Sequence, residues 1–109
     1  VSPMPVLLTN GATKDLEELY EYITLHDVPG KADYVLTQIE NAFFSLSESP
    51  DRGVYPKELL SLGIREFREI FFKPYRIIYS IRGSNVYIML IVDGRRDLQA
   101  LLQRRILEA

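Results

Sequence analysis

The sequence predicts an α+β fold with an N-terminal strand, an antiparallel helical hairpin, a mostly antiparallel four-stranded sheet and a C-terminal helix. Residues 75–82 alternate with period two and residues 86–92 are rich in β-branched side chains, and Gly83-Ser84 between them is typical of a hairpin turn. Two segments with apolar residues at helical spacing follow each other in the first half of the chain. Grouped helices and hairpin-connected strands favour α+β over a parallel α/β sheet.

The N-terminal half opens with a short apolar run, residues 5–9, which we expect to form a strand that Asn10-Gly11 ends. A helix is expected from Thr13 to about His26, because apolar side chains recur on one helical face. Asp27, two residues before a proline, fits the start of a second helix that forms a hairpin with the first. The apolar stripes are Leu16, Leu19, Tyr20 and Ile23 in the first helix and Ala32, Val35, Leu36, Ile39, Ala42, Phe43 and Leu46 in the second.

The second half begins after a turn-rich break at residues 47–53 (SESPDRG). The following loop is expected to pack on the core through Leu59, Leu60 and Leu62. Residues 64–72 (IREFREIFF) predict a strand that Pro74 ends, and Asp97 predicts the N-cap of the last helix. The buried stripe of that helix is expected to be Leu98, Leu101, Leu102 and Ile106. We expect the helices to cover one face of the sheet and to leave the other face available to a partner.

Composition narrows the class of protein. A chain of 109 residues is expected to form one domain, residues 1–109. The absence of cysteine excludes disulfides, a thiolate nucleophile and a cysteine-based zinc site, and His26 as the single histidine excludes a histidine metal cluster. We therefore expect no metal and no cofactor. No apolar run approaches membrane-spanning length and the N-terminus does not resemble a signal peptide, so a cytoplasmic protein is expected.

Charge is unevenly distributed along the chain. Residues 1–64 hold four Lys and Arg against ten Asp and Glu, whereas residues 65–109 hold nine against five. The second half is therefore basic. It either faces an anionic partner or neutralises the acidic helices within the same fold, and the sequence leaves both interpretations open.

The candidate site consists of basic residues in the second half, and Arg76 is the one placed inside a predicted strand. Its side chain points away from the face that carries Tyr75 and Tyr79, so it projects from the open face of the sheet if the tyrosines are buried. Guanidinium groups that converge there would bind phosphates or carboxylates bidentately. The candidate partner-binding residues are Arg65, Arg68, Lys73, Arg76, Arg95 and Arg96. The competing interpretation is an internal ion-pair network, such as Arg95 or Arg96 with Asp93 or Asp97.

Three stretches carry a resemblance to a known family: the helix DLEELYEYI, the strand PYRIIY and the ending GRRDLQALLQRRIL. Together they resemble toxins of bacterial type II toxin–antitoxin modules, the RelE/ParE superfamily, and the likeness covers nearly the whole chain. The resemblance implies a helical hairpin packed on an antiparallel sheet. It also implies a cognate antitoxin that neutralises the protein, with a dimer or a higher toxin–antitoxin assembly as a further expectation.

The superfamily divides by target, and the resemblance is nearer to ParE. RelE-like members cut mRNA on the ribosome, whereas ParE-like members inhibit DNA gyrase. Arg76 matches the strand arginine of the nucleases, but the last strand ends in Val92-Asp93-Gly94, without the histidine or tyrosine that nucleases carry near the chain end. Arginine is a poor proton-transfer group, and a pI of about 5.4 does not suit a ribosome ligand. The resemblance therefore favours a non-catalytic gyrase inhibitor.

Two alternatives remain open. One is a ribosome-dependent mRNA endoribonuclease that uses Arg76 with Arg95 or Arg96, and the other is a protein that binds its antitoxin without being toxic. We predict that an amphipathic segment of the antitoxin covers the sheet and its basic corner, the end of the last strand at Arg95 and Arg96. Residues 86–92 are apolar and arginines surround them, which suits such a segment.

Overall fold

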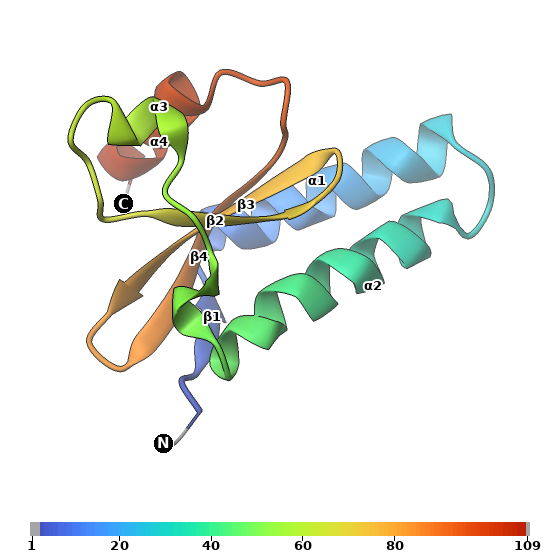
Figure 1. Cartoon of the computed structure of the whole chain (residues 1–109). Coiled ribbons are helices and arrows are strands. Elements are labelled where there is room, and N and C mark those ends of the chain that lie inside the picture. The colour runs from blue at the N-terminus through green and yellow to red at the C-terminus, as the bar shows by residue number, and fades with distance from the viewer. Residues whose placement is uncertain (1–2, 109) are drawn as a thin grey trace.

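The computed structural model describes residues 3–108 and confirms the α+β fold (Figure 1). The sheet has the strand order β1-β4-β3-β2, in which β1 runs parallel to β4 and the other neighbours are antiparallel. The strands are β1 (Val6–Leu8), β2 (Arg68–Phe72), β3 (Tyr75–Arg82) and β4 (Asn85–Asp93). The predicted hairpin of β3 and β4 thus lies at the centre of the sheet. Gly83 turns it with a φ of 60°, a conformation that glycine adopts without strain.

Helices α1 (Asn10–His26) and α2 (Lys31–Phe44) form the predicted antiparallel hairpin. Helix α1 begins three residues earlier than expected, because Thr9 caps it by accepting a hydrogen bond from the Ala12 N–H at 3.1 Å. Helix α2 begins later than expected, because Gly30 adopts a left-handed conformation with φ 89°.

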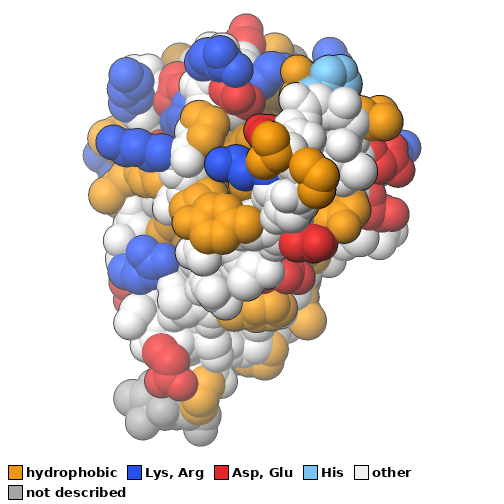
Figure 2. Space-filling model, turned by 90° about the vertical axis from the view of Figure 1, so that its right-hand side faces the viewer, with side chains coloured by type: hydrophobic (Ala, Val, Ile, Leu, Met, Phe, Trp, Pro, Cys, Tyr) orange, Lys and Arg blue, Asp and Glu red, His pale blue; other side chains and the backbone are white. Residues whose placement is uncertain are grey.

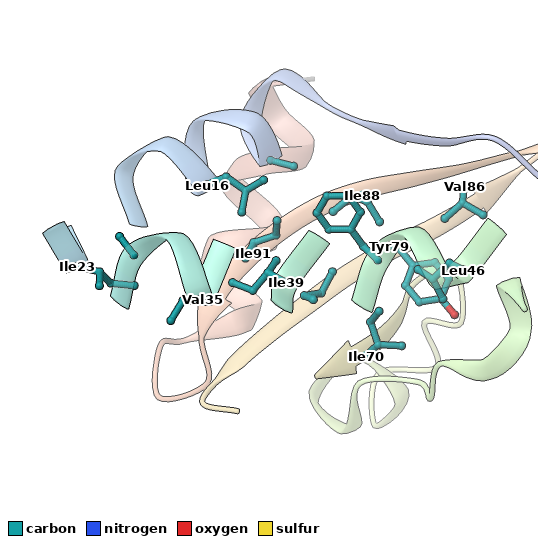
Figure 3. Close-up of a cluster of buried hydrophobic side chains, with 14 residues drawn as sticks. Leu16, Ile23, Val35, Ile39, Leu46, Ile70, Tyr79, Val86, Ile88 and Ile91 are labelled. Atoms are coloured by element: carbon teal, nitrogen blue, oxygen red, sulfur yellow. The ribbon is translucent and has the colours of Figure 1, made fainter. Parts of the chain in front are cut away.

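The hairpin packs on one face of the sheet and forms the main core (Figure 3). Side chains from both helices meet alternate residues of β3 and β4 there, as the two periodicities require. The most deeply buried of these side chains include Ile39, Phe43, Leu46, Ile77, Tyr79, Val86 and Ile88.

The opposite face of the sheet is covered, so the expectation of an open face is wrong. Helices α3 (Lys57–Leu60) and α4 (Leu98–Glu108) pack on it, as Figure 1 shows above the sheet. The physical reason is that β3 and β4 are apolar on this face too, and apolar surface must be removed from water. The second core consists of Leu59, Phe67, Ile78, Met89, Leu90, Leu98 and Leu102.

A β-bulge in β4 changes which of its side chains face the second core. Ile78 pairs with Leu90 and Tyr79 pairs with Ile88, which leaves Met89 as an extra residue without a partner. Met89 and Leu90 therefore both belong to the second core. Strand β4 lies between two packed layers and buries most of its apolar side chains within the fold, and antitoxin contact with this part of the sheet stays a prediction.

The segment between α2 and β2 is irregular, and hydrogen bonds to Tyr79 of β3 hold it in place. It contains the short helices η1 (Ser45–Ser47) and η2 (Pro50–Arg52) before α3. The buried Tyr79 hydroxyl donates to the Pro50 carbonyl at 2.6 Å and accepts from the Gly53 N–H at 3.0 Å. A Cβ at Gly53 would lie 2.5 Å from that hydroxyl, so the contact requires glycine.

Two apolar predictions in this half were only partly correct. Of the three loop leucines, Leu59 is buried, whereas Leu60 and Leu62 are exposed. Strand β2 starts at Arg68 rather than at Ile64, because the preceding residues leave the sheet to cover the second core. Within the described residues, the helices are too short or too polar to cross a membrane.

Candidate partner-binding site

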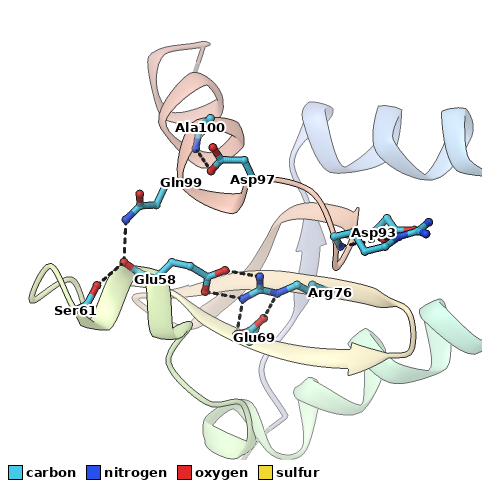
Figure 4. Close-up of polar contacts among 9 residues, drawn as sticks. Glu58, Ser61, Glu69, Arg76, Asp93, Asp97, Gln99 and Ala100 are labelled. Atoms are coloured by element: carbon cyan, nitrogen blue, oxygen red, sulfur yellow. Dashed lines mark hydrogen bonds and ion pairs between the residues drawn. The ribbon is translucent and has the colours of Figure 1, made fainter.

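Arg76 lies between two carboxylates of its own chain (Figure 4). Its Nη1 is 2.6 Å from Glu58 Oε2 on α3, and its Nε is 2.7 Å from Glu69 Oε1 on β2. Only 11% of the Arg76 side chain is exposed. The hydrogen bonds that Arg76 donates to Glu58 lower the pKa of that carboxyl to about 2, and the acceptance of its hydrogen bonds by Glu58 and Glu69 raises the pKa of Arg76. Arg76 therefore does not project freely from an open face, and its contact with a partner stays a prediction.

Arg95 forms one of the internal ion pairs that the sequence allowed. Its Nε and Nη2 each lie 3.0 Å from one carboxylate oxygen of Asp93. The side-chain hydrogen bonds from Arg95 lower the pKa of Asp93. Asp97 forms no such pair and instead caps α4 by accepting from the Ala100 N–H at 3.1 Å, as predicted.

Arg68 holds the irregular segment in place. Its Nη1 donates to the Gly53 carbonyl at 3.0 Å, and its guanidinium lies over the Tyr55 ring, 4.6 Å from the centroid. Arg65 and Lys73 are exposed at separate places, beside β2 and in the β2–β3 turn. The structure therefore does not bring the six candidate residues into one site.

Arg95 and Arg96 do share a cleft of about 560 Å³ between α1 and the segment that joins β4 to α4. We call it the α1–α4 cleft. Tyr22 of α1, Tyr75 of β3 and Arg104 of α4 line it as well. Burial chiefly raises the pKa of Tyr75, with the Asp93 carboxylate contributing. Exposed arginines and aromatic rings thus meet around this cleft.

The floor of the cleft contains an ion pair that sequence reasoning missed. Arg105 Nη2 lies 2.9 Å from Asp15 Oδ1, and Arg105 Nη1 donates to the Met89 carbonyl at 2.7 Å. Asp15 also accepts from the Ile91 N–H at 3.0 Å. The helical spacing of α4 could have indicated this pair. Arg105 lies seven residues after Leu98, two helical turns along, and therefore on the buried face of α4.

The predicted buried stripe of the last helix was wrong at Ile106. Leu98 and Leu102 are buried, but Ile106 is 49% exposed and Arg105 turns inward in its place. His26 is exposed at the tip of the helical hairpin, and its ring stacks on the ring of Tyr22, with 4.2 Å between the centroids. Among the described residues, no three potential metal ligands cluster together.

Known proteins resemble this chain both in sequence and in structure. Residues 6–98 match the model of the family described as ParE toxin of type II toxin-antitoxin system, parDE. The chain belongs to the ParE toxin family. The match spans most of the described elements, from β1 to the first residue of α4.

A curated relative supports the same assignment. Toxin ParE3 of Caulobacter vibrioides (strain ATCC 19089 / CIP 103742 / CB 15) is 30% identical over 100 residues, which is 92% of this chain and 96% of the relative. The resemblance seen in the sequence is thereby confirmed: the protein is a ParE-family toxin of a type II toxin–antitoxin system within the RelE/ParE superfamily.

Solved structures share the fold. The chromosomal ParDE system from P. aeruginosa aligns with a TM-score of 0.70 at 20% identity, covering 83% of this chain and 95% of that one. The toxin–antitoxin complex RelBE2 from Mycobacterium tuberculosis aligns with a TM-score of 0.58 at 23% identity, covering 85% and 93%.

Proposed function

We propose that this ParE-family toxin inhibits bacterial growth by binding DNA gyrase, and that a cognate antitoxin neutralises it. The observation that carries the proposal is the ParE family match across residues 6–98, together with 30% identity to Toxin ParE3. Members of the superfamily that resemble ParE act on gyrase, as the sequence resemblance implied. Such a target would place the protein in the cytoplasm.

The surroundings of the arginines support binding rather than catalysis. General acid–base cleavage requires a group that exchanges a proton near neutral pH within reach of the substrate. Arg76 is bound by two carboxylates, and Glu58 beside it has a pKa of about 2. Arg95 is likewise bound to Asp93. These groups keep one protonation state near neutrality, which suits a recognition surface.

The test is a DNA supercoiling assay with purified gyrase. We expect the wild-type protein to inhibit supercoiling and Arg96→Ala to inhibit less, since Arg96 is exposed and lines the α1–α4 cleft. Arg82→Ala is the matched control, because it removes the same charge at the β3–β4 turn, outside the cleft lining. Supercoiling that is unaffected at high molar excess of the wild-type protein would contradict the gyrase proposal.

A second candidate is a ribosome-dependent mRNA endoribonuclease. The specific observation in its favour is that Arg76 lies on β3, where the resemblance places the strand arginine of RelE-like nucleases. Primer extension on translated mRNA after induction distinguishes the two. New cleavage sites, lost in the Arg76→Lys variant, would support the nuclease and displace the gyrase proposal.

The proposed antitoxin partner is supported by the solved neighbours, which are toxin–antitoxin systems. We expect a short reading frame next to the toxin frame to encode a protein that copurifies with this chain and restores growth. Arg95 and Arg96 at the basic corner are the proposed contacts, and contacts by Arg65, Arg68 and Lys73 stay predictions, as do a dimer and a higher assembly. Growth that the co-expressed neighbour does not restore would count against this partner.

A further inference from the structure

Building on the proposed function, we infer that the α1–α4 cleft binds an acidic segment of a protein partner. Arg96 and Arg104 would hold the carboxylates of that segment, and Tyr22 and Tyr75 would pack against its apolar side chains. The inference extends the candidate site beyond the arginines found in the sequence by adding a helix α4 residue and two aromatic rings.

Two arginines of the cleft have no ion-pair partner among the described residues. Its lining holds four arginines and three acids, a net charge of +1. Asp93 is bound by Arg95 and Asp15 by Arg105, so these two pairs neutralise each other. Arg96 and Arg104 form no ion pair within residues 3–107. Their guanidinium groups are thus available, and carboxylates are ligands that a guanidinium binds bidentately.

Exposed aromatic and aliphatic side chains lie between the cleft and the tip of the helical hairpin. Tyr22 is 62% exposed, and Leu25 and Val28 beyond it are 78% and 66% exposed. Figure 2 looks onto this end of the molecule, where Lys and Arg side chains gather beside the single histidine and hydrophobic side chains lie exposed near them. Tyrosine and arginine around a hollow are the composition of energetically important positions in protein interfaces.

The loop that presents Arg96 is held by hydrogen bonds. The Gly94 N–H donates to the Pro74 carbonyl at 2.8 Å, and the Arg96 N–H donates to the Asp93 carbonyl at 3.0 Å. The side chain of Arg95 donates two further hydrogen bonds to the Asp93 carboxylate. A loop fixed before binding loses little conformational freedom when a partner arrives, and this favours affinity.

A protein segment fits the cleft better than a nucleic acid. Nucleic-acid affinity depends on many phosphate contacts, whereas this cleft offers two unpaired arginines and the whole chain carries a charge of −2. Glu18 lines the α1 side of the cleft, and Glu17 and Glu21 lie on the same helix. These carboxylates repel a continuous line of phosphates but leave room for a few acidic side chains.

An NMR titration of the ¹⁵N-labelled protein tests the inference with three probes: a short peptide of glutamate and leucine, its glutamine–leucine counterpart and a short DNA duplex. The glutamate peptide is expected to shift the amide signals of Tyr22, Tyr75, Arg96 and Arg104. The Arg96→Ala/Arg104→Ala double variant is expected to weaken its binding at least about tenfold. Arg82→Ala, which removes one exposed arginine outside the cleft lining, should bind like the wild type, and unchanged melting curves would show that all variants fold.

Three results would overturn the inference: no shifts in the cleft with the glutamate peptide, equal binding of the glutamine peptide, or tighter binding of the DNA duplex through the same arginines. The last result would make the cleft a nucleic-acid site. The titration contains neither gyrase nor cells, so its failure is distinct from a failure of gyrase inhibition.

Discussion

The two faces of the sheet are covered in different ways. On one face, α1 and α2 bury a broad apolar layer that includes Ile39 and Ile77. On the other face, the short helices α3 and α4 add a smaller apolar cluster. Two ion pairs hold these helices in place: Arg76 of β3 binds Glu58 of α3, and Arg105 of α4 binds Asp15 of α1. Apolar packing is non-directional, whereas ion pairs depend on geometry and protonation. The second face is therefore the one that pH and single charge changes should loosen.

The largest effect is expected for Arg76→Ala. The change leaves Glu58 and Glu69 without their shared cation in a largely buried position, so the free energy of unfolding should fall by about 3–5 kcal/mol. Ile39→Ala on the first face should lose about 2–5 kcal/mol through a cavity. Urea unfolding measures both. The Arg76 loss should shrink at acidic pH, where carboxylates accept protons, and the Ile39 loss should not. Equal pH dependence of the two losses would break the comparison between the faces.

A smaller effect is expected for Tyr79→Phe. The variant leaves the Gly53 N–H and the Pro50 carbonyl without their partner, so the free energy of unfolding should fall by about 1–3 kcal/mol. Tyr34→Phe is the matched control, because Tyr34 is half exposed and should change stability by less than about 0.5 kcal/mol. Indistinguishable urea midpoints for the two variants would show that Tyr79 does not pin the segment before β2.

Acid should destabilise the protein through Glu58. The ordinary pKa of this carboxyl is 4.5, and in the fold it is about 2. Between these values the unfolded chain binds more protons than the folded chain, so stability rises with pH across the window. The contribution is fully present above pH 4.5 and is lost as the pH falls toward about 2. Unfolding measured at several pH values should show a shallower acid dependence for Glu58→Gln, and an unchanged slope would argue against the ion pair.

The smallest effect is expected for the exposed pair of Arg95 and Asp93. Water screens it, so Arg95→Ala should leave the thermal midpoint nearly unchanged at low and at high salt. A clear loss of stability would mean that the loop before α4 contributes to the fold and does not only present Arg96.

The sequence predicted the elements better than the contacts between them. Period-two alternation identified the β3–β4 hairpin, and helical stripes identified α1 and α2, because these patterns are local. The bulge at Met89 was invisible, since one extra residue only changes which face the following side chains join. The bulge lets Met89 and Leu90 both join the second core, which the leucines of α3 and α4 cover.

The candidate site was harder to predict because its contacts are long-range. Arg76 could be placed on a strand, but Glu58 lies in a four-residue helix that no periodicity marks. Asp15 and Arg105 lie 90 positions apart, and charge alone does not select one partner among the acids of α1. The exposed arginines at the end of β4 were found because they follow a strand directly.

The pairing of β1 with β4 has a consequence for synthesis on the ribosome. Val6 lies beside Val86, so the first strand has no neighbour until most of the chain has been made. A nascent chain that ends before residue 85 holds the helical hairpin without β4, the strand against which α1 packs. Such distant pairing delays folding until late in translation. Ribosome-bound chains of that length should be cut readily by protease, whereas chains with residues 1–109 outside the exit tunnel should resist. The β1–β4 pairing, and with it the complete sheet, can therefore form only after β4 has left the exit tunnel.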